Sequence, residues 1–204
     1  MILDLLAPPL CWSCGSLAVR GAPLCRACRS SLRFLGPDPV ALGGVPVWAP
    51  LAYEGPARDL VKALKFRGAT GVARAMAALI VATAPPALLA GSLVSVPLHP
   101  ARRRTRPFNQ AALVAREISS RAGLPECDCL RRAGSHRRQV GRDRAERLEG
   151  PSGTIHAARP APPAALLVDD VVTTGATFAA CATALREAGS ERVAAVAFAR
   201  TAGR

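Results

Sequence analysis

Acidic and aromatic residues are scarce in this sequence. Aromatic residues make up 4% of the 204 positions, and 14 acidic residues stand against 27 lysines and arginines, so the formal net charge is +13. Such a charge points to polyanionic ligands or partners, but it does not distinguish a small phosphorylated ligand from a nucleic acid. The hydrophobic share of 50% is enough for a core, although much of it is alanine, and the length allows one ordinary domain with a small appendage.

Several motifs and segments are also missing. Neither GxGxxG nor GxxxxGKS/T occurs, which argues against dinucleotide-binding and ATPase functions. The amino terminus contains Asp4 and has no basic region, unlike a signal peptide. Residues 75–98 carry no charge, but Pro85, Pro86 and Gly91 interrupt them, so they predict a helix, a turn and a strand. We therefore expect a cytoplasmic protein without a membrane span.

Residues 164–177, AALLVDDVVTTGAT, form the most informative stretch. Five apolar residues precede Asp169 and Asp170, and two valines then lead into a loop of threonines with one glycine. An apolar run of this length between two prolines and Gly175 is typical of a buried parallel strand, with a helix beginning near Ala176. Because ligands of open α/β sheets bind beyond the carboxyl ends of the strands, we expect a binding site here.

The loop after this strand is suited to a phosphate monoester. It consists of Thr173, Thr174, Gly175, Ala176 and Thr177. The glycine permits a tight turn and a close approach to an anion, while three hydroxyls and the amides of the helix start can donate hydrogen bonds. The two preceding aspartates could accept hydrogen bonds from ribose hydroxyls or lie near a magnesium ion, which prefers oxygen ligands. As an alternative, the stretch is only a strand end followed by a helix cap.

Four of the seven cysteines form two CxxC pairs with ten residues between them: Cys11, Cys14, Cys25 and Cys28. Two such pairs can deliver four thiolates to one tetrahedral zinc ion. Disulfides are the alternative, but nothing else in the sequence indicates an oxidising compartment. The pattern predicts a zinc module over residues 8–36 that is too short to be stable without metal. Cys127, Cys129 and Cys181 are interpreted as ordinary or buried thiols.

A second strand end lies in the middle of the chain. A predicted strand over Ser92–Val96 ends at Pro97, Leu98 and His99, and four guanidiniums follow within five residues, on Arg102, Arg103, Arg104 and Arg106. Asn109 is placed to cap the next helix, with Gln110 after it. Before this strand, a helix over Ala57–Phe66 carries Lys65, and Arg67 follows it. Both are candidate phosphate contacts or parts of a solvated helix end.

These segments resemble the ComF family of the type I phosphoribosyltransferases. LLVDDVVTTGAT is similar to the phosphoribosyl pyrophosphate motif, VPLHPARRRTRPFNQA to the ComF signature at the pyrophosphate loop, and the cysteine pairs to the module that many members carry. The resemblance implies a doubly wound, parallel α/β phosphoribosyltransferase-like domain over residues 45–204, behind the zinc module. A helix over Ala176–Ala188 and a strand over Arg192–Ala199 fit the parallel crossover that such a sheet requires.

The resemblance also implies roles for the residues. Residues 173–177 would hold the 5-phosphate, and Asp169 and Asp170 the ribose hydroxyls and the magnesium shell. Residues 97–106 would hold the pyrophosphate, with Asn109 and Gln110 adding ligand contacts; within this segment Arg102 and Arg106 would act in catalysis. An arginine cluster can bind pyrophosphate bidentately and stabilise the charge on it as it leaves. A solvated basic turn or a nucleic-acid patch are the alternatives for the cluster.

Some positions depart from the family pattern. Pro107 replaces a glycine, and Gly150 stands where an asparagine is common. Residues 130–150 contain seven arginines and include Gln139, and they would form either a lid or a nucleic-acid surface. Two functions follow from the resemblance. The first is transfer of a phosphoribosyl group to an unidentified nitrogenous acceptor. The second is a non-catalytic role in DNA uptake, with single-stranded DNA and a helicase of the competence machinery as partners.

Overall fold

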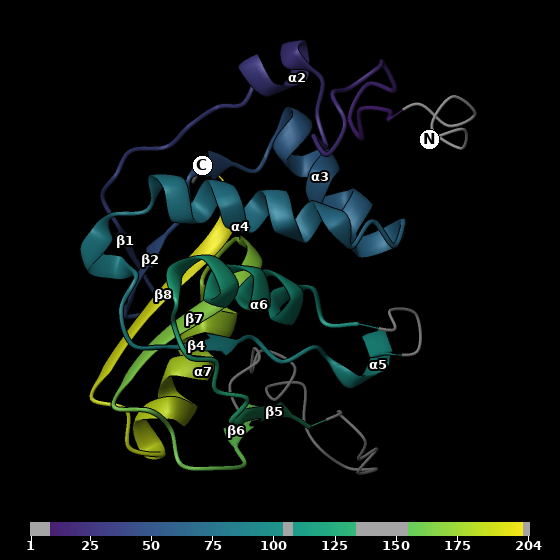
Figure 1. The fold of residues 1–204 in the computed structure, drawn as a ribbon. Coiled ribbons are helices and arrows are strands. Elements are labelled where there is room, and N and C mark those ends of the chain that lie inside the picture. The colour runs from purple at the N-terminus through teal and green to yellow at the C-terminus, as the bar shows by residue number, and fades with distance from the viewer. Residues whose placement is uncertain (1–8, 104–107, 134–154, 202–204) are drawn as a thin grey trace, which may run out of the picture.

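The computed structural model describes residues 9–103, 108–133 and 155–201. Figure 1 shows a sheet with helices on both faces and a small amino-terminal module above helices α3 and α4. The helices are α2 (Arg26–Ser30), α3 (Gly55–Phe66), α4 (Gly71–Thr83), η1 (Pro86–Leu88), α5 (Pro100–Arg103), α6 (Gln110–Ala122) and α7 (Ala176–Glu187). The expected α/β fold with an amino-terminal four-cysteine module is therefore confirmed.

The main sheet has the strand order β1-β2-β8-β7-β4, and the short strand β3 also pairs with β8. All pairings are parallel except that of β1 with β2. The strands are β1 (Val40–Leu42), β2 (Val45–Trp48), β3 (Leu51–Ala52), β4 (Ser92–Ser95), β7 (Ala164–Val172) and β8 (Arg192–Arg200). A separate antiparallel pair joins β5 (Leu130–Arg132) to β6 (Ile155–Ala157).

Alternation along the central strands divides the core between the two faces of the sheet. Leu166, Val168 and Phe198 pack toward α3, α4 and α6, whereas Leu167 and Ala195 pack toward α7 and the β5–β6 pair. Each buried leucine, valine or phenylalanine contributes about 1.5–3 kcal/mol relative to an exposed one. Strands buried on both faces therefore show continuous apolar runs, which is why the sequence predicted them.

The helix ends follow local chemistry. The Asn109 side chain accepts a hydrogen bond from Ala111 N at 3.1 Å and so caps α6 as expected, while Gly123 ends this helix in the left-handed conformation with φ 68°. Glu187 ends α7 one residue before the predicted position. Within the part of the chain that the structure describes, no helix is long and apolar enough to cross a membrane.

Gly43 and Gly44 form the turn of the β1–β2 hairpin. Their φ angles of 59° and 74° suit a two-residue hairpin turn, which glycine adopts without strain. The main sheet thus begins at Val40, ahead of residue 45. The hairpin also packs on α7, because a Cβ atom added to Gly43 would lie 2.7 Å from the Cβ of Ala179.

The amino-terminal module is docked onto the sheet and α3. Leu35 N donates to Pro50 O at 2.8 Å, and Ala52 N donates to Arg33 O at 2.9 Å, so residues after α2 run along the β3 end of the sheet. The Ser13 hydroxyl donates to Asp59 Oδ2 at 2.8 Å on α3. The module therefore has fixed contacts with the α/β domain through both backbone and side chains.

Candidate functional site

The carboxyl ends of β4 and β7 lie side by side. The two strands pair in parallel up to Ser95 and Val168, and Val96 N continues the pairing by donating to Val168 O at 3.0 Å. The segment after β4 and the loop after β7 therefore leave the same edge of the sheet. This is the position at which ligands bind in open α/β folds.

A cavity of about 180 Å³ lies between these two segments and α3. The residues that line it are Lys65, Val96, Pro97, Leu98, His99, Arg102, Asn109, Gln110, Ala111, Arg132, Asp169, Asp170, Val171 and Thr177. A smaller hollow of about 40 Å³ is lined by Asp169 and by residues 171–178. The structure thus brings the two predicted ligand segments and the acid pair together at one place.

Most of the predicted site residues meet at these two hollows. Pro97, Leu98, His99, Arg102, Asn109 and Gln110 line the cavity, and residues 173–177 line the smaller hollow. Arg103 belongs to α5, and its side chain is outside the described part of the structure. Arg104, Arg106, Pro107, Gln139 and Gly150 lie outside the described residues.

The loop after β7 turns at Gly175. Its φ is 79°, and its carbonyl accepts a hydrogen bond from Ala179 N at 2.8 Å in the first turn of α7. A Cβ atom at this position would lie 2.5 Å from the Cβ of Leu42. Glycine is therefore required here for two reasons, the left-handed backbone and the close approach of the β1–β2 hairpin.

The second acid of the pair is held by a lysine from α3. Lys65 Nζ lies 2.7 Å from Asp170 Oδ1, and the two side chains are 20% and 4% exposed. Lys65 therefore lies at the cavity and not at a solvated helix end, and its role as a phosphate contact stays a prediction. Arg67 lines a different groove, next to the amino-terminal module. Removal of either partner of such a buried pair would leave the other charge uncompensated, at a cost of roughly 3–5 kcal/mol.

The first acid of the pair has an unusual protonation equilibrium. Burial, and then the neighbouring Asp170 carboxylate, raise the pKa of Asp169 from 3.8 to about 7, although Lys65, the Asp170 amide and Arg102 act in the opposite direction. Asp169 Oδ1 accepts the hydrogen bond from Asp170 N at 2.8 Å. Asp169 thus gains or loses a proton near neutral pH, which makes the charge of the cavity sensitive to its occupant.

Arg132 is a cavity residue to which sequence reasoning gave no role, because it was one of seven arginines in residues 130–150. It ends β5, and its Nε is buried and has no hydrogen-bond partner among the described residues. The same holds for Nε2 of Gln110, a residue that is 3% exposed. The alternation of side chains along β5 could have indicated that Arg131 and Arg132 point to opposite faces. The strand that pairs with β5, however, lies more than twenty residues away in the sequence, so no local pattern showed which face meets the cavity.

The four cysteines of the module form a compact sulfur cluster. The sulfur atoms of Cys11, Cys14, Cys25 and Cys28 all lie within 4.8 Å of one another. Cys14 Sγ and Cys25 Sγ are 3.7 Å apart, close to the spacing of about 3.8 Å in a tetrahedron with Zn–S bonds of about 2.3 Å. Hydrogen bonds from Ser16 lower the pKa of Cys14 to about 6, whereas burial raises the pKa of Cys28 to about 12, so the spacing of the sulfur atoms is what supports zinc. The residues therefore fit a structural zinc ion.

Fold and site define a parallel α/β domain that has a polar cavity at its strand edge and carries a zinc-binding module. Residues 2–48 match the family model described as a double zinc ribbon domain. The chain is 26% identical over 200 residues to Competence protein F of Haemophilus influenzae, covering 90% of this chain and 87% of that protein. The resemblance to the ComF family is thus confirmed along nearly the whole chain.

Two solved structures show more limited similarity. One is titled as the allosteric regulatory enzyme of purine biosynthesis, with a TM-score of 0.41 and 20% identity over 61% of this chain and 25% of that enzyme. The other is the protein TT1426 from Thermus thermophilus, with a TM-score of 0.38 and 21% identity over 64% of this chain and 83% of that chain. The chain thus spans one quarter of the length of the first.

The zinc site gives a first prediction. Replacement of two ligands, Cys14→Ser with Cys28→Ser, should abolish zinc retention and expose residues 9–36 to protease, because the metal supplies the folding energy of so small a module. Metal analysis and limited proteolysis measure both effects. The matched control is Cys127→Ser, which lies outside the module and should keep its zinc. Full zinc content in the double variant would contradict the assignment.

The raised pKa of Asp169 gives a second prediction. Its folded pKa of about 7 lies above the unfolded value of 3.8, so the unfolded state binds fewer protons in this interval and stability falls as pH rises through it. Asp169→Asn should therefore be more stable than the wild type by roughly 1–3 kcal/mol near pH 8, with the difference vanishing toward pH 4. Urea unfolding across this pH range measures the effect. Asp128→Asn, at an exposed carboxylate, is the control, and a stability difference that does not change with pH would contradict the prediction.

Proposed function

We propose that the protein binds phosphoribosyl pyrophosphate with magnesium and transfers the phosphoribosyl group to a nitrogenous acceptor, with release of pyrophosphate. The observation that carries this proposal is the meeting of two strand ends around one cavity, a glycine-turned hydroxyl loop after β7 and a basic segment after β4. The resemblance to the ComF family supports the same donor. We expect the protein in the cytoplasm, where the four module thiols stay reduced and able to bind metal.

The two hollows suit the two ends of the donor. The amides at the start of α7 and the hydroxyls of Thr173, Thr174 and Thr177 would hold the 5-phosphate, since a helix start with hydroxyl donors is a phosphate site. The segment from Pro97 to Arg102 would hold the pyrophosphate. The acid pair lies between them, where its carboxylate oxygens can accept hydrogen bonds from the ribose hydroxyls.

The acid pair also fits magnesium, which takes oxygen ligands and usually shares them with substrate phosphates. When bound, the ion would neutralise charge on the pyrophosphate. Asp170 Oδ1 is engaged by Lys65, so the free oxygens of the pair would face the ion or its water shell.

The reaction itself requires positioning more than acid–base chemistry. The nitrogen lone pair of the acceptor forms a bond to the anomeric carbon, and the bond from that carbon to the pyrophosphate oxygen breaks with its electron pair leaving on pyrophosphate. The acceptor nitrogen then releases its proton to water. Arg102 lies at the pyrophosphate side of the cavity, where a fixed cation stabilises this developing charge. Asp169 and Asp170 hold the ribose so that the anomeric carbon faces the acceptor.

The test is a calorimetric titration of the full chain with phosphoribosyl pyrophosphate and magnesium. The wild type should bind, and Asp169→Asn with Asp170→Asn should bind at least about tenfold more weakly, because the ribose hydroxyls lose charged acceptors. Asp128→Asn should bind as the wild type does. Absence of binding in the wild type would contradict the site. Binding without pyrophosphate release across a panel of nitrogenous bases would favour a non-catalytic role.

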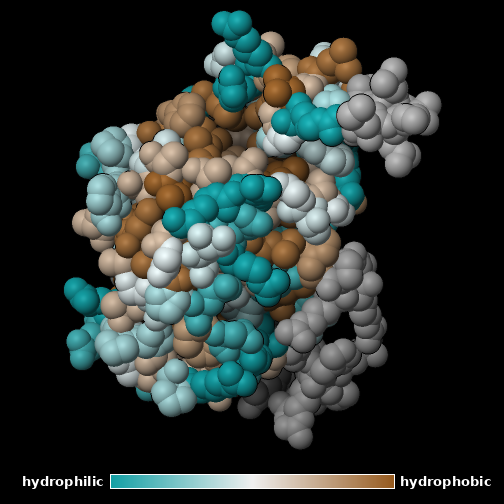
Figure 2. All heavy atoms as spheres, in the orientation of Figure 1, coloured by the Kyte–Doolittle hydropathy of each residue, from teal (hydrophilic) through white to brown (hydrophobic). Residues whose placement is uncertain are grey.

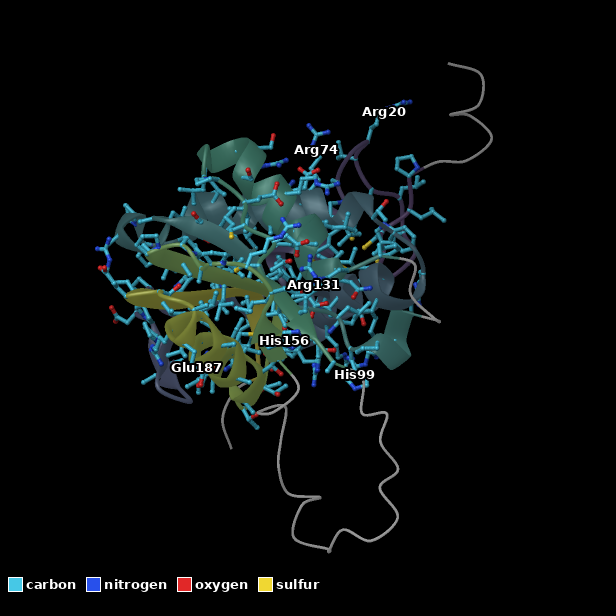
Figure 3. All side chains as sticks on the ribbon, turned by 90° about the horizontal axis from the view of Figure 1, so that it is seen from below. Arg20, Arg74, His99, Arg131, His156 and Glu187 are labelled. Carbon is cyan, nitrogen blue, oxygen red and sulfur yellow. The ribbon has the colours of Figure 1, made fainter. Side chains whose placement is uncertain are left out.

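A second candidate function is binding of single-stranded DNA in partnership with the DNA-uptake machinery, including a helicase. The supporting observation is a groove of about 1110 Å³ between the module and the start of α4. Arg20, Arg67 and Arg74 line it together with Trp12, and no acidic residue does so within the described part of the chain. In Figure 2 apolar residues gather between the module and the helices, and Figure 3 shows Arg20 and Arg74 on this side of the molecule. Cations beside an exposed indole suit a polyanion that carries stacking bases.

This candidate has its own test. Trp12→Ala with Arg67→Ala should weaken binding of an oligothymidylate by at least about tenfold and reduce its salt dependence, because one stacking contact and one phosphate contact are lost. Fluorescence anisotropy at several salt concentrations measures both. Arg192→Ala, at the opposite end of the sheet, is the matched control. Unchanged binding in the double variant, or no binding by the wild type, would contradict this function.

A further inference from the structure

Two residues that line the cavity at the strand ends carry buried nitrogen donors without acceptors among the described residues. Gln110 Nε2, at the start of α6, and Arg132 Nε, at the end of β5, have no hydrogen-bond partner among the described residues, and both residues line the cavity at the strand ends. The two donors come from elements that are separate in sequence. Their convergence on one hollow therefore indicates a site that a bound group completes.

The chemistry of these donors defines what that group must be. An amide N–H and a guanidinium N–H can only donate, so the occupant must present acceptor atoms. Burial lowers the pKa of Arg132, and the nearby Arg102 acts in the same direction. Arginine nevertheless stays protonated in proteins, so a second positive charge is held beside Arg102 in a confined space. An anion with several oxygens satisfies both the donors and the charges.

We propose that Arg132 and Gln110 bind the pyrophosphate end of the donor and stay bonded to it as it leaves. This inference rests on the proposed function. The two residues share their cavity with Pro97, His99 and Arg102, whereas Thr173, Thr174 and Gly175 line the other hollow. The pair therefore serves the end of the ligand that lies beyond β4 and not the 5-phosphate.

The position of Arg132 is fixed by the β5–β6 pair. Arg132 lies opposite Ile155 in this antiparallel ladder, and Ile155 is buried against the α7 side of the core. The guanidinium is thus held by a packed element and needs little rearrangement to bind its anion, which is the condition for effective stabilisation of a leaving group.

The adjacent arginine provides a matched control. Arg131 donates to Asp128 Oδ1 at 2.8 Å and to Oδ2 at 3.0 Å. It lines the adjoining cavity of about 600 Å³ beside α6, which shares Pro97, Leu98 and Asn109 with the candidate site, and it does not line the candidate site itself. Successive side chains of a strand point to opposite faces, which explains why two neighbouring arginines have different surroundings. Figure 3 shows Arg131 beside His156, its partner across the β5–β6 pair.

The experiment compares three probes by calorimetry in the presence of magnesium: phosphoribosyl pyrophosphate, pyrophosphate and ribose 5-phosphate. Arg132→Ala should weaken binding of the first two by more than about tenfold and change binding of ribose 5-phosphate by less than about twofold. Arg132→Lys should recover only part of the loss, since an ammonium cannot replace the guanidinium fork. Arg131→Ala should bind all three as the wild type does.

A second variant keeps the test independent of folding. Gln110→Met preserves the volume of the side chain and removes the unpaired amide, so its Tm should rise without ligand while its affinity for pyrophosphate falls. Equal weakening of ribose 5-phosphate, or unchanged pyrophosphate binding by folded Arg132→Ala and Gln110→Met, would overturn this inference alone. A wild type that binds none of the three probes would overturn both this inference and the proposed function.

Discussion

The parallel pairing of β4 with β7 is the constraint on which the rest of the site depends. It makes the basic segment after β4 and the hydroxyl loop after β7 leave the sheet at the same edge. The register is fixed by the core, because β7 is buried on both faces and a slip of one residue would exchange Leu166 and Leu167 between two differently shaped layers. The pairing therefore positions both candidate phosphate-binding segments before any ligand is present.

The loop after β7 is supported from behind by the start of the sheet. Leu42 of the β1–β2 hairpin packs so closely on Gly175 that no side chain fits between them. The hairpin follows the zinc module directly, and the module itself is bonded to β3 and α3. The zinc module, the β1–β2 hairpin and the loop after β7 therefore form one continuous series of segments in contact with one another.

Several charged and polar side chains of the cavity lack full compensation from the other described residues of the fold. Lys65 compensates Asp170, but Asp169 is driven toward its neutral form, and Gln110 and Arg132 keep buried donors without acceptors among the described residues. Such arrangements lower the stability of the folded chain and persist where binding requires them. Burial of the apolar layers on both faces of the sheet offsets this loss of stability.

Local sequence determined the elements and the zinc module. Apolar runs predicted β4, β7 and β8, Asn109 marked the start of α6, and the spacing of four cysteines defined the metal cluster, since each of these signals acts over a few residues. The acids and hydroxyls beside the strand ends were predictable for the same reason. Only the tertiary structure decided that Lys65 reaches Asp170 while Arg67 turns to another groove, that the Gly43 turn supports Gly175, and that Arg132 rather than Arg131 enters the cavity. Those outcomes depend on strand pairing and helix packing between distant segments, which no local pattern encodes.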